Sequence, residues 1–291
     1  MFNSAVSRVL LLSLALPMSW VLPIQAHAAS LSEPQAIQCL ENFISRYQPL
    51  SGYKTTVTKK EWNEKGEVSR NEKMEITNKK NNQIRIKYID EGSTGIRNNG
   101  MTVTYSGGQE AEITLGEANF FGSFARNAAA LIIGDKMNIL HPKMIEDEIL
   151  TLNRAGFDFL SQLIKRHLPY AREAKTGGVT LADGKACQVR YKPYAEGSDA
   201  VTLEPSQSIF DLEEKYGTLA YFIYRSNRAQ FDSFADLFDR KKSVTISIPR
   251  GFSELDLDLD PVNYLPTKMV LKFNSKDVGS YSFENTELYR N

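Results

Sequence analysis

The chain has 291 residues and a formal net charge of zero, with 35 Lys and Arg residues against 35 Asp and Glu residues. Nucleic-acid binding needs clustered Lys and Arg that nearby acids do not compensate, so this balance argues against a nucleic-acid partner. The length allows one large domain or two small ones, with enough residues for a sizeable hydrophobic core.

The first 28 residues have the pattern of a secretory signal peptide. Arg8 is their only charged residue, Pro17 and Pro23 interrupt the apolar run, and Ala26-His27-Ala28 offers a small-x-small cleavage pattern. We therefore predict cleavage after Ala28 and export. The alternative is an uncleaved membrane anchor, which the two prolines and the cleavage pattern disfavour. No later stretch reaches the roughly 20 apolar residues of a spanning helix, so a soluble exported protein is expected.

Two cysteines, Cys39 and Cys187, follow the predicted cleavage point. Export would place them in a compartment where a disulfide persists, so we predict a bridge between them. The alternative is a pair of buried thiols that pack as small hydrophobic groups. The sequence contains no CxxC motif of the redox or zinc-binding kind.

The first predicted element is a helix that starts at the capping box Ser32–Gln35 and ends near Pro49. From Tyr53 the apolar period changes from that of a helix to two. Short turns rich in Gly and Asn separate the alternating segments, which predicts an antiparallel meander with one buried and one exposed face. The five predicted strands are 53–62, 67–80, 82–90, 101–106 and 111–115.

The middle of the chain, about 120–243, has a different composition. Residues 117–134 are apolar and almost uncharged, and helical periodicity follows over 144–150 and 157–174. A short helix is expected at 231–238. Strand patterns return in the second half of the chain, at 185–194, 218–226, 243–250, 255–260, 267–273 and 280–288.

The acidic residues Asp256, Asp258 and Asp260 are spaced two apart, as at the start of a calcium loop. An EF-hand loop also needs Gly at its sixth position and Glu at its twelfth, and these positions hold Pro261 and Thr267. An amphipathic strand explains the spacing better, because leucines alternate strictly with the acids. These leucines are Leu255, Leu257 and Leu259.

The neighbouring strands alternate in the same way, so the sheet presents a long apolar face. Either the predicted helices cover this face completely, which is the usual arrangement, or the cover leaves a cavity for a hydrophobic ligand. In the second case, the candidate ligand-binding residues are Ile84, Ile86, Tyr88, Met101, Val103, Tyr105, Leu255, Leu257, Leu259, Met269, Leu271 and Phe273.

Two segments resemble the periplasmic lipoprotein-carrier (LolA-like) superfamily, and most closely a branch of exported bacterial proteins on that fold. Arg85 matches the Arg of an "fRw"-like strand, and residues 99–105 match the hairpin "dG-x-x-v-w-x-Y". The tail, residues 255–291, resembles the closing strands of the family. It contains the "lP" pair and the "f-x-n-x-x-x-N" ending, at Leu265-Pro266 and at Phe283, Asn285 and Asn291. The resemblance covers about 33–120 and 244–291.

The resemblance implies an α+β fold: a curved, incomplete antiparallel β-barrel wrapped around α-helices, with a hydrophobic cavity that accepts acyl chains. It implies a single periplasmic domain over 29–291, with a long central insertion at about 120–243. In that family the Arg strand helps to hold a lid over the cavity, although alternation places Arg85 opposite Ile84 and Ile86. The apolar segment after residue 117 is either a lid or a packed core helix, and its lid residues would be Phe120, Phe121 and Phe124.

No catalytic motif of the common hydrolase, metalloprotease, P-loop or dinucleotide-binding kinds occurs in the sequence. The acidic cluster Glu146-Asp147-Glu148 near His141 is explained by an exposed helix face. We therefore expect no enzyme, no metal site and no cofactor. The expected function is a non-catalytic binding module for an acyl chain, a lipid or a lipidated protein, with peripheral membrane contact. The alternative is an envelope-stress or assembly protein with a closed core that acts through a protein partner. The sequence alone does not predict an oligomeric state.

Overall fold

The computed structural model describes residues 28–79, 83–89, 100–107, 110–114, 132–133, 136–138, 149–150, 154, 156–173, 179–181, 187–191, 197–238, 240–249 and 254–290. The predicted signal peptide, apart from Ala28, lies outside these residues. So do the lid candidates Phe120, Phe121 and Phe124, and the acidic cluster 146–148.

Within the described residues, twelve strands form one sheet, and all neighbouring strands in it are antiparallel. The first and last long strands of the chain pair at the centre of the sheet, while two short strands form its ends. In spatial order the strands are β6 (Ile132–Ile133), β7 (Lys136–Asn138), β5 (Glu110–Thr114), β4 (Thr102–Tyr105), β3 (Gln83–Tyr88), β2 (Val68–Lys79), β1 (Leu50–Trp62), β14 (Lys276–Arg290), β13 (Pro266–Phe273), β12 (Glu254–Leu259), β9 (Gln188–Tyr191) and β8 (Val179–Leu181).

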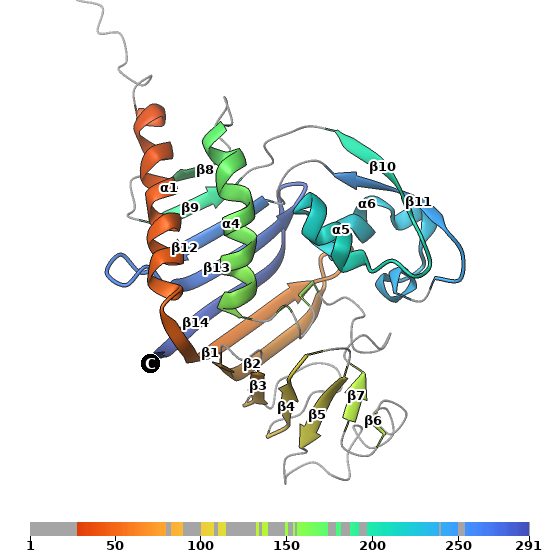
Figure 1. Ribbon diagram of the computed structural model, residues 1–291, viewed down its shortest axis with the longest axis horizontal. Coiled ribbons are helices and arrows are strands. Elements are labelled where there is room, and N and C mark those ends of the chain that lie inside the picture. Colours follow the sequence, from red (N-terminus) through yellow and green to blue (C-terminus); the bar gives the residue numbers. More distant parts are fainter. Residues whose placement is uncertain are drawn as a thin grey trace, which may run out of the picture.

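Two helices, α1 (Ala28–Tyr47) and α4 (Phe157–Glu173), lie side by side across one face of this sheet (Figure 1). We call this face the inner face. The apolar stripe predicted for α4 is buried against the sheet, with Phe157, Leu160 and Leu163 almost fully covered. The predicted start of α1 at Ser32 is wrong. The helix begins at Ala28, so Pro34 lies inside it, and the good helix formers Ala28, Ala29 and Leu31 account for the added turn.

Irregular pairing bends the long ladder between β1 and β14. The register shifts between Leu50 and Gly52 and again between Lys54 and Thr56. Opposite the second shift, Asn285 has a left-handed backbone with a φ of 53°. An extra residue on one strand of a pair bends that strand and increases its twist. The sheet therefore curves around the helices instead of lying flat against them.

A smaller unit, residues 197–249, lies beside the main sheet (Figure 1). It contains the two-stranded sheet β10 (Ser198–Leu203) and β11 (Val244–Pro249), together with α5 (Ile209–Tyr216), α6 (Ala220–Ser226), η3 (Arg228–Gln230) and η4 (Phe234–Leu237). Arg228 pairs with Glu64 in the β1–β2 turn at 3.0 Å, and Phe222 stacks on Phe273 of β13. These two contacts attach the unit to the main sheet at the β1–β2 turn and at the end of β13.

The strand predicted at 218–226 is wrong, because most of this segment forms α6. Its residues from Ala220 to Tyr224 are all buried. A short apolar run that is covered on every side has no polar face, and its period therefore cannot distinguish a strand from a helix. The preceding helix α5 was not predicted either. Its signals are the capping box of Ser208 and Asp211 and the left-handed Gly217 at its end.

The predicted fold class is confirmed. The chain is an α+β protein in which a curved, open antiparallel sheet wraps around helices. Among the described residues, no helix is both long enough and apolar enough to cross a membrane.

Candidate functional site

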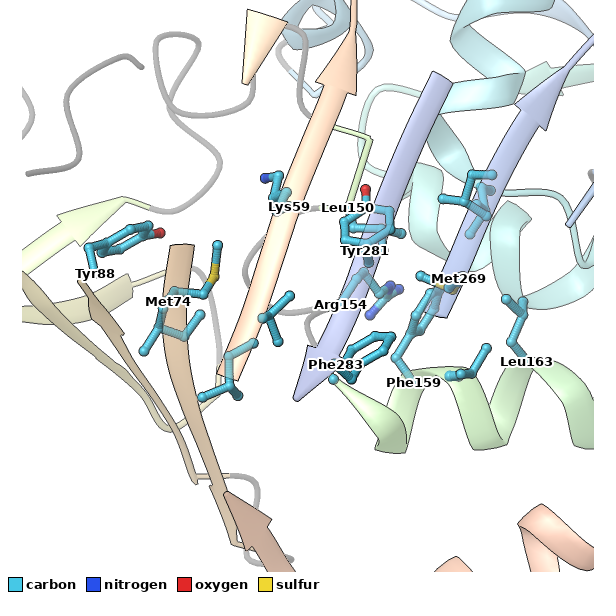
Figure 2. A pocket seen from close by; sticks show the side chains of 17 residues that line it. Lys59, Met74, Tyr88, Leu150, Arg154, Phe159, Leu163, Met269, Tyr281 and Phe283 are labelled. Carbon is cyan, nitrogen blue, oxygen red and sulfur yellow. The ribbon is translucent and has the colours of Figure 1, made fainter. Parts of the chain in front are cut away.

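A cavity of about 60 Å³ lies between α4 and the central strands of the inner face (Figure 2). Its walls come from strands β1, β2, β3, β13 and β14, from α4 and the residues just before it, and from one residue ahead of α6. The lining residues are Val57, Lys59, Met74, Ile76, Ile86, Tyr88, Leu150, Arg154, Gly156, Phe159, Leu160, Leu163, Leu219, Met269, Leu271, Tyr281 and Phe283.

Tight contacts fix the start of α4 against the sheet. The Phe157 backbone N–H donates to the Tyr53 hydroxyl oxygen at 2.8 Å, and the two rings stack with centroids 4.4 Å apart. Gly156 precedes the helix with a φ of 97°, and a Cβ there would lie only 2.0 Å from the Tyr53 hydroxyl. Only glycine fits this position. Gly156 and the first turn of α4 are therefore held against the inner face.

Strand pairing arranges the inner face in rows. In one row, Val57 of β1 lies between Met74 of β2 and Phe283 of β14. Two residues further along β1, Lys59 lies between Glu72 and Tyr281. Because side chains two apart share a face, the apolar row continues directly into a charged one.

The charged row consists of Lys59, Glu61, Arg70 and Glu72, all buried. The Lys59 ammonium lies 3.4 Å from Glu61 and 3.6 Å from Glu72, and the Tyr281 hydroxyl donates to Glu61. Arg70 of β2 lies directly opposite Glu61 in the backbone register of the two strands. Two positive and two negative charges are thus gathered where water is excluded, and buried ions are tolerated only when paired in this way.

A second pair of charges, Arg154 and Glu213, borders the cavity. The Arg154 Nε donates to the Glu213 Oε1 at 2.8 Å, and the Ala220 backbone N–H donates to the Oε2 at 3.0 Å. Burial raises the pKa of the Glu213 carboxyl, and the Arg154 charge and the Ala220 hydrogen bond offset part of that rise. The guanidinium carbon lies 4.2 Å from the Phe210 ring centroid and 5.3 Å from that of Phe159.

Four of the residues that the sequence proposed for ligand binding line the cavity: Ile86, Tyr88, Met269 and Leu271. The others do not line the cavity. They are the buried core residues Ile84, Met101, Val103, Leu255, Leu257 and Leu259, and the partly buried Tyr105 and Phe273, which pack against that core. Arg85 is exposed and lies on the outer face, beside Thr77 and Thr104. Alternation predicted that position, which keeps Arg85 away from the cavity.

The sequence did not single out most of the cavity wall. Val57 and Met74 could have been found, because they alternate within strands that were predicted correctly. Tyr281 and Phe283 face them only because the last strand pairs with the first, at a separation of more than two hundred residues. Nothing local to either strand indicates that pairing.

The predicted bridge between Cys39 and Cys187 is confirmed, with an S–S distance of 2.06 Å and 5.5 Å between the Cα atoms. It joins α1 to the residue ahead of β9. The two cysteines are 148 residues apart in sequence. In the chain-entropy model, a loop of this size stabilises the folded state by about 4–5 kcal/mol.

The interpretation of the acidic repeat as a strand is confirmed, because it forms β12 with Leu255, Leu257 and Leu259 buried. Asp256 pairs with Lys272 across the strands at 2.6 Å. Asp260 accepts hydrogen bonds from the backbone N–H groups of Val262 and Asn263. In the part of the chain that the structure describes, no group of three or more His, Cys, Asp or Glu residues is arranged to hold a metal ion.

No family model matches the chain, and no curated protein matches its sequence. The chain is similar to a LolA superfamily protein. That solved structure, from Nitrosomonas europaea, is 8% identical with a TM-score of 0.36, and the alignment covers 88% of this chain and 94% of the other. A second similar structure is the lipoprotein LppX of Mycobacterium tuberculosis, at 9% identity and a TM-score of 0.29, covering 87% and 93%.

Proposed function

We propose that this chain is an exported, non-catalytic binding module that holds an acyl chain, a lipid or a lipidated protein between its sheet and α4. The cavity composition carries the proposal. Of the seventeen residues that line it, only Lys59 and Arg154 are charged, and the remainder are mainly Leu, Ile, Met and aromatic side chains. A partly enclosed apolar space with a few polar groups is the usual form of a small-molecule site.

The size of the cavity sets a condition on this function. Its volume of about 60 Å³ is well below the roughly 150 Å³ of an apolar cavity that accepts benzene. An acyl chain therefore enters only if the wall opens. Met74 and Met269 make this feasible, because the unbranched methionine side chain repacks easily.

Filling the cavity tests the proposal. We expect Leu163→Trp to abolish the uptake of radiolabelled palmitate, measured by gel filtration after delipidation, because its indole occupies the space. Overpacking costs about 1–3 kcal/mol, so the melting temperature must show that the variant is folded. Val262→Trp is the matched control, since Val262 is 79% exposed. Unchanged palmitate uptake by a folded Leu163→Trp variant would contradict the proposal.

The small volume also supports a second function, in which the core is closed and the chain acts through a protein partner. In that case neither the native protein nor either Trp variant takes up palmitate. The palmitate experiment therefore separates the two functions directly.

A further inference from the structure

We infer that Arg154 binds the anionic head of the ligand, so that the cavity selects an acyl chain that ends in a carboxylate or a phosphate. This inference rests on the proposed function and names the ligand class of the same site. Two features of Arg154 support it: the way Glu213 holds the guanidinium, and the number of its N–H groups that already donate to a protein acceptor.

Glu213 fixes the orientation of Arg154 through one edge of the guanidinium. Its Oε1 accepts from the Arg154 Nε at 2.8 Å, and its Oε2 accepts from the Ala220 backbone at 3.0 Å. Glu213 is only 3% exposed, so the carboxylate that holds the arginine is itself fixed in the core. An arginine held in this way is pre-organised for a ligand.

Among the residues that the structure describes, only one N–H group of Arg154 has a protein acceptor. An arginine has five N–H groups, and the Nε supplies one of them. Within the residues that the structure describes, the two terminal amino groups of Arg154 donate to no protein acceptor. The side chain keeps 24% of its surface exposed and lines the cavity beside Phe159 and Phe283 (Figure 2). A planar pair of amino groups matches the two oxygens of a carboxylate or a phosphate.

The surroundings favour an anion at this position. Phe210 packs on the Arg154 guanidinium at 4.2 Å and shields it from water. The other cation of the cavity, Lys59, has two carboxylates within 3.6 Å, so its charge is already compensated.

The experiment compares heads on one apolar chain. Native protein, recovered from the periplasm after expression of the full chain and then delipidated, is titrated calorimetrically with laurate, dodecyl phosphate and 1-dodecanol. The two anions are kept below their micellar concentrations and the alcohol below its solubility limit. Two charge-assisted hydrogen bonds should make at least one anionic ligand about 10- to 100-fold tighter than the alcohol. Preference for laurate identifies a free fatty acid as the source of the anion, and preference for dodecyl phosphate identifies a lipid phosphate.

The decisive variant is Arg154→Gln combined with Glu213→Gln, which removes the arginine without leaving a buried carboxylate unpaired. It should lose about tenfold or more in affinity for the preferred anion while its affinity for 1-dodecanol changes less than about twofold. Arg154→Lys, which keeps the charge but not the planar pair of donors, should be intermediate. Arg85→Gln on the outer face is the control and should change neither affinity.

Two results would overturn the inference while the proposed function stands: equal affinity of the native protein for the alcohol and both anions, or an equal loss for alcohol and anion in the double variant. If none of the three ligands binds the native protein, the proposed function fails together with the inference.

Discussion

Two sets of charged side chains border the same apolar cavity, and they differ in burial and pairing. The charged row of Lys59, Glu61, Arg70 and Glu72 is enclosed between β1, β2 and β14, with the Lys59 ammonium between two carboxylates. Arg154 instead uses one N–H group on Glu213 and keeps part of its surface exposed. The difference indicates that the first set maintains the fold, while the second can interact with a ligand.

The largest expected effect is on the charged row. Glu61→Ala removes the acceptor of the Tyr281 hydroxyl and one partner of Lys59, leaving positive charge buried. We expect the free energy of unfolding, measured in urea, to fall by about 3–5 kcal/mol. The matched control is Asp256→Ala, which breaks a partly exposed pair with Lys272 and should cost less than about 1 kcal/mol. Equal losses in the two variants would show that the row is not a buried network.

A smaller loss of stability is expected at the second set. Arg154→Ala leaves Glu213 with the Ala220 N–H as its hydrogen-bond donor. Because the carboxyl can take up a proton when its partner is lost, we expect a decrease of about 1–2 kcal/mol in the free energy of unfolding near neutral pH. Urea unfolding of Arg154→Ala and Glu61→Ala under the same conditions measures the difference between their losses of stability. A loss as large as that of Glu61→Ala would place Arg154 among the structural charges.

The pH dependence of stability tests the environment of Glu213. Burial raises the pKa of the Glu213 carboxyl in the folded state above its ordinary value of 4.5. The folded protein then binds this proton more tightly than the unfolded chain, so stability contributed by this group falls as pH rises from about 4.5 through the folded-state pKa. We expect the free energy of unfolding of the native protein, relative to that of Glu213→Gln, to be smaller at about pH 7.5 than at about pH 4, which means a less stable protein at the higher pH. A constant difference between these pH values would refute the predicted pKa rise.

The smallest effect is expected on the outer face. Arg85 is exposed, and β3 turns it away from the cavity. Arg85→Gln should therefore change the free energy of unfolding by less than about 0.5 kcal/mol, measured by urea unfolding. A larger loss would mean that this arginine has a structural role that its exposed position does not indicate.

The spacing of apolar residues was sufficient to predict several elements that have one buried and one exposed side. The leucines of β12, the isoleucines of β3 and the apolar stripe of α4 were all predicted from their spacing and are buried. The same logic failed for α6, since Ala220–Tyr224 is buried all round and offers no contrast between faces.

Most residues of the candidate site could not be predicted from the sequence. Lys59, Glu61 and Glu72 look like exposed positions in an alternating strand, because charged side chains are seldom fully buried. Their burial follows from β14, which brings Tyr281 beside them from the far end of the chain. Arg154 likewise acquires its partner Glu213 from the separate 197–249 unit. Long-range pairings of this kind leave no periodic signal in either segment.

The most direct test of the central claim is to ask what the native protein carries. The full chain is expressed in a bacterial host, purified without detergent, extracted with organic solvent and analysed by mass spectrometry for lipids and acylated species. An amphiphile in near-stoichiometric amount, with an anionic head on an acyl chain, is the predicted result. A clean extract, repeated after incubation with phospholipid vesicles and with a lipidated peptide, would contradict it and indicate a closed core.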